Sequence, residues 1–187
     1  MNMMAPKTAA EEALGLVLPS RRDEEWKWTD LKRLIDKPYA VAAAEVDANA
    51  LERLVKTAPL ANVKLQRIVI VNGKLHSKPD GIDVSNDVPE ITHVDPVLEL
   101  NSKLKANTYC LSFNGNVDHP LEVLHISTGQ GAAIASRLHI VVSSGASATV
   151  VETFVGEGEY LNNPVTTIEV ADGARLDRVK IETEAPS

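Results

Sequence analysis

Cys110 is the residue of this chain best suited to bind iron or carry sulfur, because a thiolate is both a nucleophile and a metal ligand. It is the only cysteine in the sequence. Iron–sulfur clusters are normally held by several thiolates, so one cysteine does not make a cluster site. Cys110 also lies in the alternating run Tyr109–Phe113, where a small thiol packs well in a protein core. We therefore expect it to be structural.

Two histidines, His125 and His139, each stand in the middle of the same local sequence, Leu-His-Ile. A pair of imidazoles without a third ligand binds a metal ion weakly. The alternation of side chains along a strand predicts that both histidines point outward. The residues expected to point inward are their neighbours Leu124, Ile126, Leu138 and Ile140.

The segment Gly129–Ile134 begins like a dinucleotide-binding fingerprint. Its sixth position is Ile134, where the fingerprint has glycine or alanine, and a strand pattern follows where a helix would be needed. Walker A, Gly-x-Ser-x-Gly and His-Glu-x-x-His motifs do not occur in the sequence. We assign no catalytic residue, no cofactor-binding residue and no metal ligand.

Trp26 and Trp28 are two of the few aromatic residues, which make up 4% of the chain. We expect at least one of them to anchor the N-terminal segment on its neighbours. The alternative is a patch that docks a partner, since tryptophan is enriched at interface hot spots. The segment Arg21–Thr29 is the best candidate for such a contact.

The composition is that of an ordinary globular protein, with 187 residues, 44% hydrophobic residues and a net charge of -7. Its basic residues are interleaved with acidic ones, which argues against nucleic-acid binding. A single cysteine fits a reducing compartment. The segment Met1–Ser20 lacks the basic start and long apolar run of a signal peptide, and no apolar run is long enough to span a membrane. We expect a cytoplasmic protein.

The first part of the chain, residues 1–108, has the pattern of helices and one hairpin. We expect helical structure over about 8–37, and helices at Asp47–Lys56 and Pro96–Leu104. Between them Arg67–Val71 is a strand that ends in Asn72-Gly73, a dipeptide typical of tight reversals.

The second part, residues 109–187, consists of short β-rich runs. Gly145-Ala146 recurs as Gly173-Ala174, at a spacing of 28, and Leu-His-Ile recurs at a spacing of 14. A spacing of 14 within 28 predicts a flattened coil with two strands per turn. The expected strands are 109–113, 121–127, 137–142, 148–155, 165–170 and 175–181.

Four stretches then resemble one known family, in the family's own order. They are Leu18–Thr29, Ile70–Gly73, His119–Ile126, and Glu152–Tyr160 with Gly173–Leu176 after it. These stretches are similar to the SufB/SufD family, which belongs to the SUF machinery for iron–sulfur cluster assembly. The SufB and SufD branches both stay open at this point.

The resemblance implies a mainly β protein with N-terminal helices, in which a small α/β region leads into the first coils of a right-handed parallel β-helix. It also implies a non-catalytic scaffold subunit that pairs with SufB and works with the SufC ATPase. We expect the chain to stop part-way through the β-helix, before the SufC-binding region. This would leave a last coil through which the chain forms a homodimer. Because those later parts have no counterpart here, no family site residue carries over.

Two other classes of function remain as alternatives. A β-solenoid enzyme would show a hexapeptide ladder or a groove with clustered acidic and basic residues, and neither is evident. A stand-alone binding protein for a small molecule would respond to metabolites in a thermal-shift screen.

Overall fold

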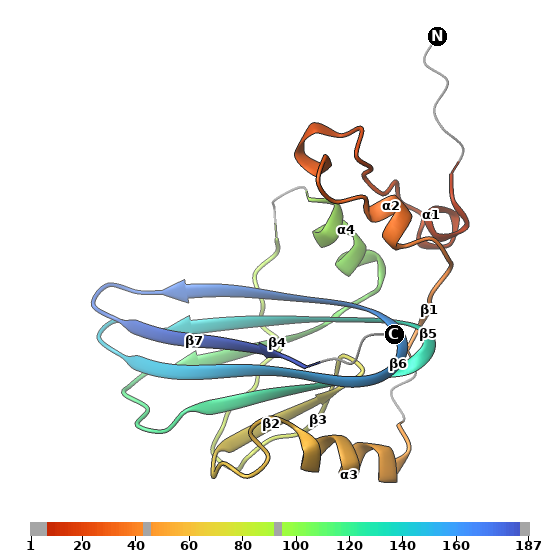
Figure 1. Cartoon of the computed structure of the whole chain (residues 1–187). Coiled ribbons are helices and arrows are strands. Elements are labelled where there is room, and N and C mark those ends of the chain that lie inside the picture. Colours follow the sequence, from red (N-terminus) through yellow and green to blue (C-terminus); the bar gives the residue numbers. More distant parts are fainter. Residues whose placement is uncertain (1–6, 43–45, 92–94, 184–187) are drawn as a thin grey trace.

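A computed structural model describes residues 7–42, 46–91 and 95–183, and these residues form a mainly β protein with a mostly parallel sheet (Figure 1). The helices are α1 (Ala9–Leu14), α2 (Leu31–Leu34), α3 (Ala48–Thr57) and α4 (Pro96–Lys103), with a short 3-10 turn η1 (Glu24–Trp26). The strands are β1 (Ala40–Val41), β2 (Gln66–Val71), β3 (Lys74–Ser77), β4 (Asn107–Phe113), β5 (Leu121–Val142), β6 (Ser147–Val170) and β7 (Arg175–Glu182).

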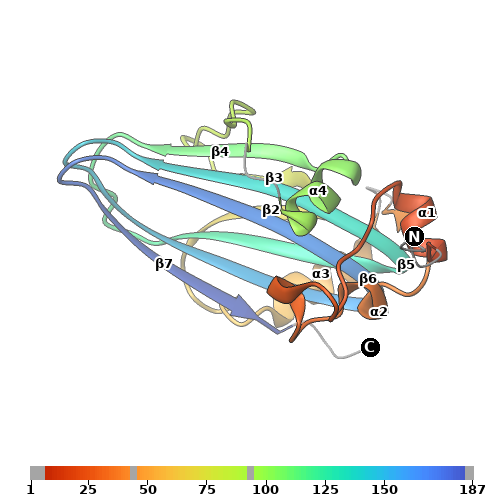
Figure 2. The same cartoon turned by 90° about the horizontal axis from the view of Figure 1, so that it is seen from above.

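The two long strands β5 and β6 each fold back on themselves into a U, so that four of the expected short strands are merged into two (Figure 2). β6 pairs in parallel with β5 from Val150 to Val170, over the length of β5. Leu121 pairs with Val150 and Ala132 pairs with Tyr160, while Ser147 of β6 pairs with Arg175 of β7. The repeat spacing predicted from the sequence is therefore the distance along the chain between stacked U-shaped layers.

The bends of the two U-shaped strands stack closely, and glycine is required there. Gly158 has φ 94°, in the left-handed region that other residues rarely adopt. A Cβ atom at this position would lie 2.2 Å from the carbonyl oxygen of Gly129 in the bend below. The Gly129–Ile134 segment thus serves as a bend within β5, and no helix follows it.

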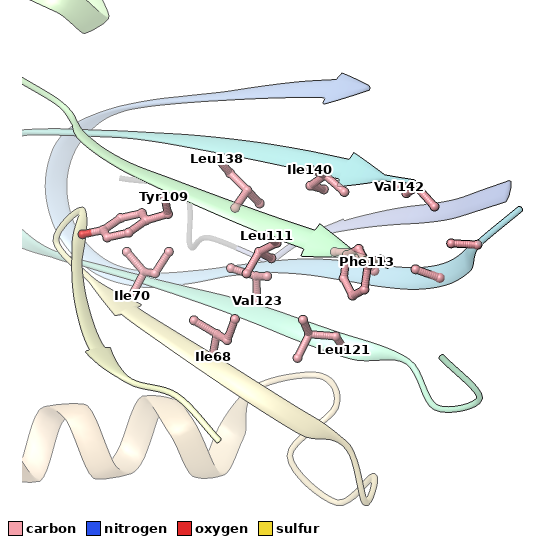
Figure 3. Close-up of a cluster of buried hydrophobic side chains, with 13 residues drawn as sticks. Ile68, Ile70, Tyr109, Leu111, Phe113, Leu121, Val123, Leu138, Ile140 and Val142 are labelled. Carbon is pink, nitrogen blue, oxygen red and sulfur yellow. The ribbon is translucent and has the colours of Figure 1, made fainter. Parts of the chain in front are cut away.

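The main core lies inside the U, between its two halves (Figure 3). One side is formed by β2 and the first halves of β5 and β6, and the other by β4 and the second half of β5. Burying a side chain of this kind contributes roughly 1.5–3 kcal/mol. The core side chains that Figure 3 labels are Ile68, Ile70, Tyr109, Leu111, Phe113, Leu121, Val123, Leu138, Ile140 and Val142.

One predicted orientation was wrong. Leu124 and Ile126 point out of the U, where they pack with Leu54 of α3 in a second cluster. Their neighbours Leu121 and Val123 belong to the interior core, so His125 shares the inward side. Both faces of this half of β5 are buried, so its apolar alternation is lost. In the second half, Leu138 and Ile140 point inward as expected, and His139 points outward.

The remaining helices cover the bends of the U (Figures 1 and 2). Leu16, Ile35 and Leu100 pack there with Ala133 of β5. Helix α4 is also joined to the strands by Asn101, which is fully buried. Its Nδ2 donates to the backbone oxygens of Ser136 and Asn163, at 3.2 and 2.7 Å, and its Oδ1 accepts from Arg137 Nε at 2.7 Å.

The two helices expected at 47–56 and 96–104 are confirmed, with Asp47 and Asp95 as their N-caps. The hairpin is also confirmed, because Asn72 and Gly73 both have positive φ. The expected helical stretch at 8–37 is broken into α1, η1 and α2, because its last turns start from a separate cap, Asp30.

Among the residues that the structure describes, no helix is long and apolar enough to cross a membrane. The division of the chain at residue 108 stays a prediction.

Candidate functional site

Exposed apolar side chains of the strands lie at and near β7, the last strand of the sheet order β3-β2-β5-β6-β7. Within the described part of the chain, β7 pairs only with β6. Val179 on β7 is 49% exposed, and Ile168 and Val170 on the second half of β6 are each 45% exposed. We call β7 together with Ile168 and Val170 the β7 surface. Exposed apolar groups next to a free strand edge are typical of contact surfaces.

Behind the β7 surface, a buried carboxylate lies inside the U. Glu152 of β6 is fully buried, although it pairs with Val123 in the middle of the apolar core. Arg178 of β7 donates to Glu152 Oε2 from its Nε at 2.5 Å, and its Nη2 contacts the same oxygen. Thr166, from the other half of the U, donates to Oε1 at 2.8 Å. The carboxylate is therefore stabilised by partners from two strands, as a buried charge requires.

His125 lies beside this carboxylate and is also buried. Its ring stacks on Phe154, with 4.3 Å between the ring centroids, and Lys180 Nζ lies 4.9 Å from the centroid of Phe154. Its Nε2 has no hydrogen-bond partner among the described residues and lies 3.8 Å from Glu152 Oε1. Burial, reinforced by the positive charges of Lys180 and Arg178, lowers the pKa of His125 to about 3. The imidazole is neutral at physiological pH.

A second buried carboxylate repeats the arrangement on the outer side of the same strands. Glu122 of β5 is fully buried and accepts from Arg67 Nε at 2.5 Å and from Thr153 Oγ1 at 2.7 Å. Arg67 also donates to the carbonyl oxygen of Leu60, at 2.9 Å. Each of these glutamates is thus held by an arginine and a threonine from other strands or halves.

Cys110 and His139 lie on neighbouring strands, at paired positions of β4 and β5. Cys110 is a buried free thiol whose Sγ is 3.7 Å from Ser112 Oγ. His139 Nδ1 is 2.8 Å from Thr167 Oγ1, and its Nε2 is 3.9 Å from Glu169. No group of three or more metal-ligating side chains occurs among residues 7–42, 46–91 and 95–183.

The two tryptophans behave differently. Trp26 is half-buried, in agreement with an anchoring role. Trp28 is 86% exposed, and Lys27 Nζ lies 5.7 Å from the centroid of its ring. The segment around Trp28 projects away from the strands (Figure 1).

Sequence reasoning missed the buried carboxylates Glu122 and Glu152 and the partly exposed arginines that pair with them, Arg67 and Arg178. A signal was present for the two glutamates, because each is a lone charged residue within a run of strand-forming residues. Such a residue indicates a paired buried charge, since an unpaired one in that position is strongly destabilising.

Comparisons with known proteins relate the chain to the SUF system. Residues 125–187 match the family model described as SUF system FeS cluster assembly, SufBD core domain. The chain is 29% identical over 195 aligned residues to the iron–sulfur cluster assembly protein SufD of Escherichia coli (strain K12). That alignment covers 94% of this chain and 45% of the relative, so the chain spans less than half of the relative's length. This chain is therefore similar to SufD, and its residues 125–187, which lie in the stacked strands β5, β6 and β7, are similar to the SufBD core domain.

Proposed function

We propose that this chain is part of a non-catalytic scaffold subunit in iron–sulfur cluster assembly, which pairs with SufB and works with the SufC ATPase in the cytoplasm. The observation that carries the proposal is the overlap of the SufBD core match, residues 125–187, with the stacked strands β5, β6 and β7. The similarity to SufD extends over 94% of the chain. We further propose that the U-shaped layers are the first coils of a right-handed parallel β-helix.

A scaffold role agrees with where the chain places its polar groups. Each buried carboxylate is paired with an arginine from a neighbouring strand. A charge held in such a pair is better suited to stabilising structure than to taking part in a reaction. Stacked layers give a stiff body, because each layer contacts only the next one. Such a body can present a surface to other subunits at a fixed distance from its first layer.

The β7 surface is the part of the described chain that we assign to contact with the partner. It combines an edge strand with the half-exposed side chains Ile168, Val170 and Val179. Apolar side chains at the centre of an interface contribute most of its binding energy when the partner excludes water from them. SufB, as a related protein with the same core, is the partner expected there.

The test is capture of SufB by the tagged intact chain, with and without SufC. We expect SufB to be retained by the wild type and retained at least tenfold less by Val179→Lys, because a lysine there would place an ammonium group in the contact. Val63→Lys is the matched control, since Val63 is also 49% exposed but lies after α3, outside the β7 surface.

Failure of the wild-type chain to retain SufB would overturn the proposed pairing. Equal loss of SufB from both variants would show that charge alone, and not the β7 surface, controls the contact. ATP hydrolysis by the chain without SufC would contradict the non-catalytic role.

A further inference from the structure

The contact between β6 and β7 inside the U combines aliphatic packing with charged and aromatic groups, whereas β2 and β5 meet through aliphatic side chains alone in the main core. β2 and β5 bring Ile68, Ile70, Leu121 and Val123 into one apolar cluster. At the level of β7, Leu176 still packs against this cluster, but the Arg178–Glu152 ion pair and the ammonium of Lys180 over the ring of Phe154 are added to it. Ion pairs depend on protonation, and aliphatic contacts do not.

We propose that the interior cluster of His125, Glu152, Arg178 and Lys180 is an acid-sensitive latch, which holds β7 on β6 at neutral pH and releases β7 when the imidazole is protonated. The geometry provides two alternative partners for one carboxylate. Glu152 Oε2 is bound by Arg178, while Glu152 Oε1 lies 3.8 Å from Nε2 of His125. A proton on Nε2 would give Glu152 an ion-pair partner on β5, one that does not depend on β7.

The charges around His125 explain why the two states exclude each other. Both cations that oppose a proton on the imidazole, Arg178 and Lys180, are on β7, and Lys180 is itself paired with Glu182 of that strand. On β6 the neighbours are Glu152 and Phe154, and on β2 the paired residue is the apolar Ile70. When β7 leaves, both opposing charges leave with it and water reaches the ring.

The direction of the pH dependence follows from these contacts. With β7 in place the pKa of His125 is lowered to about 3, and in the released state we expect the ordinary value of about 6.5. Above pH 6.5 neither state binds the proton, so acidification has no effect there. Between pH 6.5 and 3 only the released state binds it, so release becomes more favourable as the pH falls. At pH 5 the ratio of released to latched molecules should be about 30-fold higher than at pH 8.

The experiment is amide hydrogen exchange of the intact chain followed by mass spectrometry at pH 8 and pH 5, with rates corrected for the intrinsic pH dependence of exchange. We expect the protection of β7, residues 175–182, to fall about 30-fold at pH 5, while that of β4, residues 107–113, is unchanged. His125→Phe keeps a ring against Phe154 without the titrating nitrogen, so the loss of protection should disappear. His139→Phe is the matched control, and in this variant β7 should still lose protection at pH 5.

Lys180→Met provides a second variant that leaves His125 in place. It removes one of the two opposing cations, so the latched state should bind the proton at a higher pH, and the ratio of β7 protection between pH 8 and pH 3.5 should be smaller than in the wild type. Unchanged β7 protection in the wild type, an equal fall in β4, or the same fall in His125→Phe would each overturn the latch. If His125→Phe does not fold, a wild-type NMR titration decides the question. An imidazole that titrates near pH 6.5 while β7 stays protected would contradict the proposal.

Discussion

Single residues in this protein are held by contacts that reach well beyond their own element. Glu11 of α1 is the clearest case, because its side chain is fully buried. Its carboxylate accepts from the backbone N–H of Thr8 at 2.7 Å and of Leu18 at 2.9 Å, and Lys32 Nζ of α2 lies 2.9 Å away. One side chain thus caps α1 and joins it to the next segment and to α2.

We predict that Glu11→Gln destabilises the fold of the N-terminal helices by roughly 2–3 kcal/mol at pH 7. Burial raises the pKa of this carboxyl, but the Thr8 N–H, Lys32 and the Leu18 N–H outweigh it and lower the pKa to about 2. The carboxylate therefore stabilises the fold fully above its ordinary pKa of 4.5, and less as the pH falls toward 2.

Urea unfolding at pH 7 and at pH 3 measures this effect. The difference between the wild type and Glu11→Gln should be smaller at pH 3. Glu12→Gln is the control, because Glu12 is its exposed neighbour on the same helix. A difference that is independent of pH would mean that Glu11 acts only through packing.

At the scale of elements, the sequence predicts structure well where local chemistry decides it. Asp47, Asp95 and the Asn72-Gly73 turn each specify a helix start or a reversal through their own backbone and side-chain preferences. The repeat spacing also predicts the pairing of β5 with β6, because stacked layers repeat the same turn glycines.

Features that depend on tertiary contacts, such as the orientation of a strand or the bounds of a short helix, cannot be predicted in this way. The sequence of 121–127 does not predict which face of the strand points into the U, because both faces are buried, one of them under α3. The same ambiguity hides the inward position of His125, and with it the latch. The helices α1 and α2 are too short to form by propensity alone, so packing and caps such as Asp30 determine their bounds.

Helix α4 offers a test of how much one buried polar side chain contributes to fastening an element. We predict that Asn101→Ala lowers the free energy of unfolding by roughly 2–3 kcal/mol, because three buried hydrogen bonds to β5 and β6 are lost. Thermal unfolding measures this, and Asn49→Ala in α3, which is exposed, should change stability by less than about 0.5 kcal/mol. Equal effects of the two substitutions would show that Asn101 does not fasten α4.

At the scale of the whole molecule, the interior of the U differs between its two ends. The first layer, with β2 and β4, is built on an aliphatic core, and the layer that carries β7 has the charged interior and the exposed apolar groups. The aliphatic core and the exposed apolar groups of the β7 surface thereby lie in different layers of the stack.

We predict that the isolated chain self-associates through the β7 surface at micromolar concentration. The exposed side chains of Ile168, Val170 and Val179 supply the apolar contact, and an edge strand can pair with its copy. Sedimentation velocity across a concentration series should show a dimer for the wild type and for Val63→Lys, and a monomer for Val179→Lys. A wild-type monomer throughout the series would exclude this contact.

The strands β5, β6 and β7 follow one another at a regular offset, so that one sequence repeat builds one layer of the stack. Each repeat adds one strand spacing, about 4.8 Å, to the height of the stack. A duplicated repeat would move everything beyond it by that amount and preserve every pairing. A single inserted residue within β6 would instead turn Glu152 out of the interior and bring Val151 in, so that Arg178 would lose its partner. In evolution the stack can therefore be lengthened only by whole repeats.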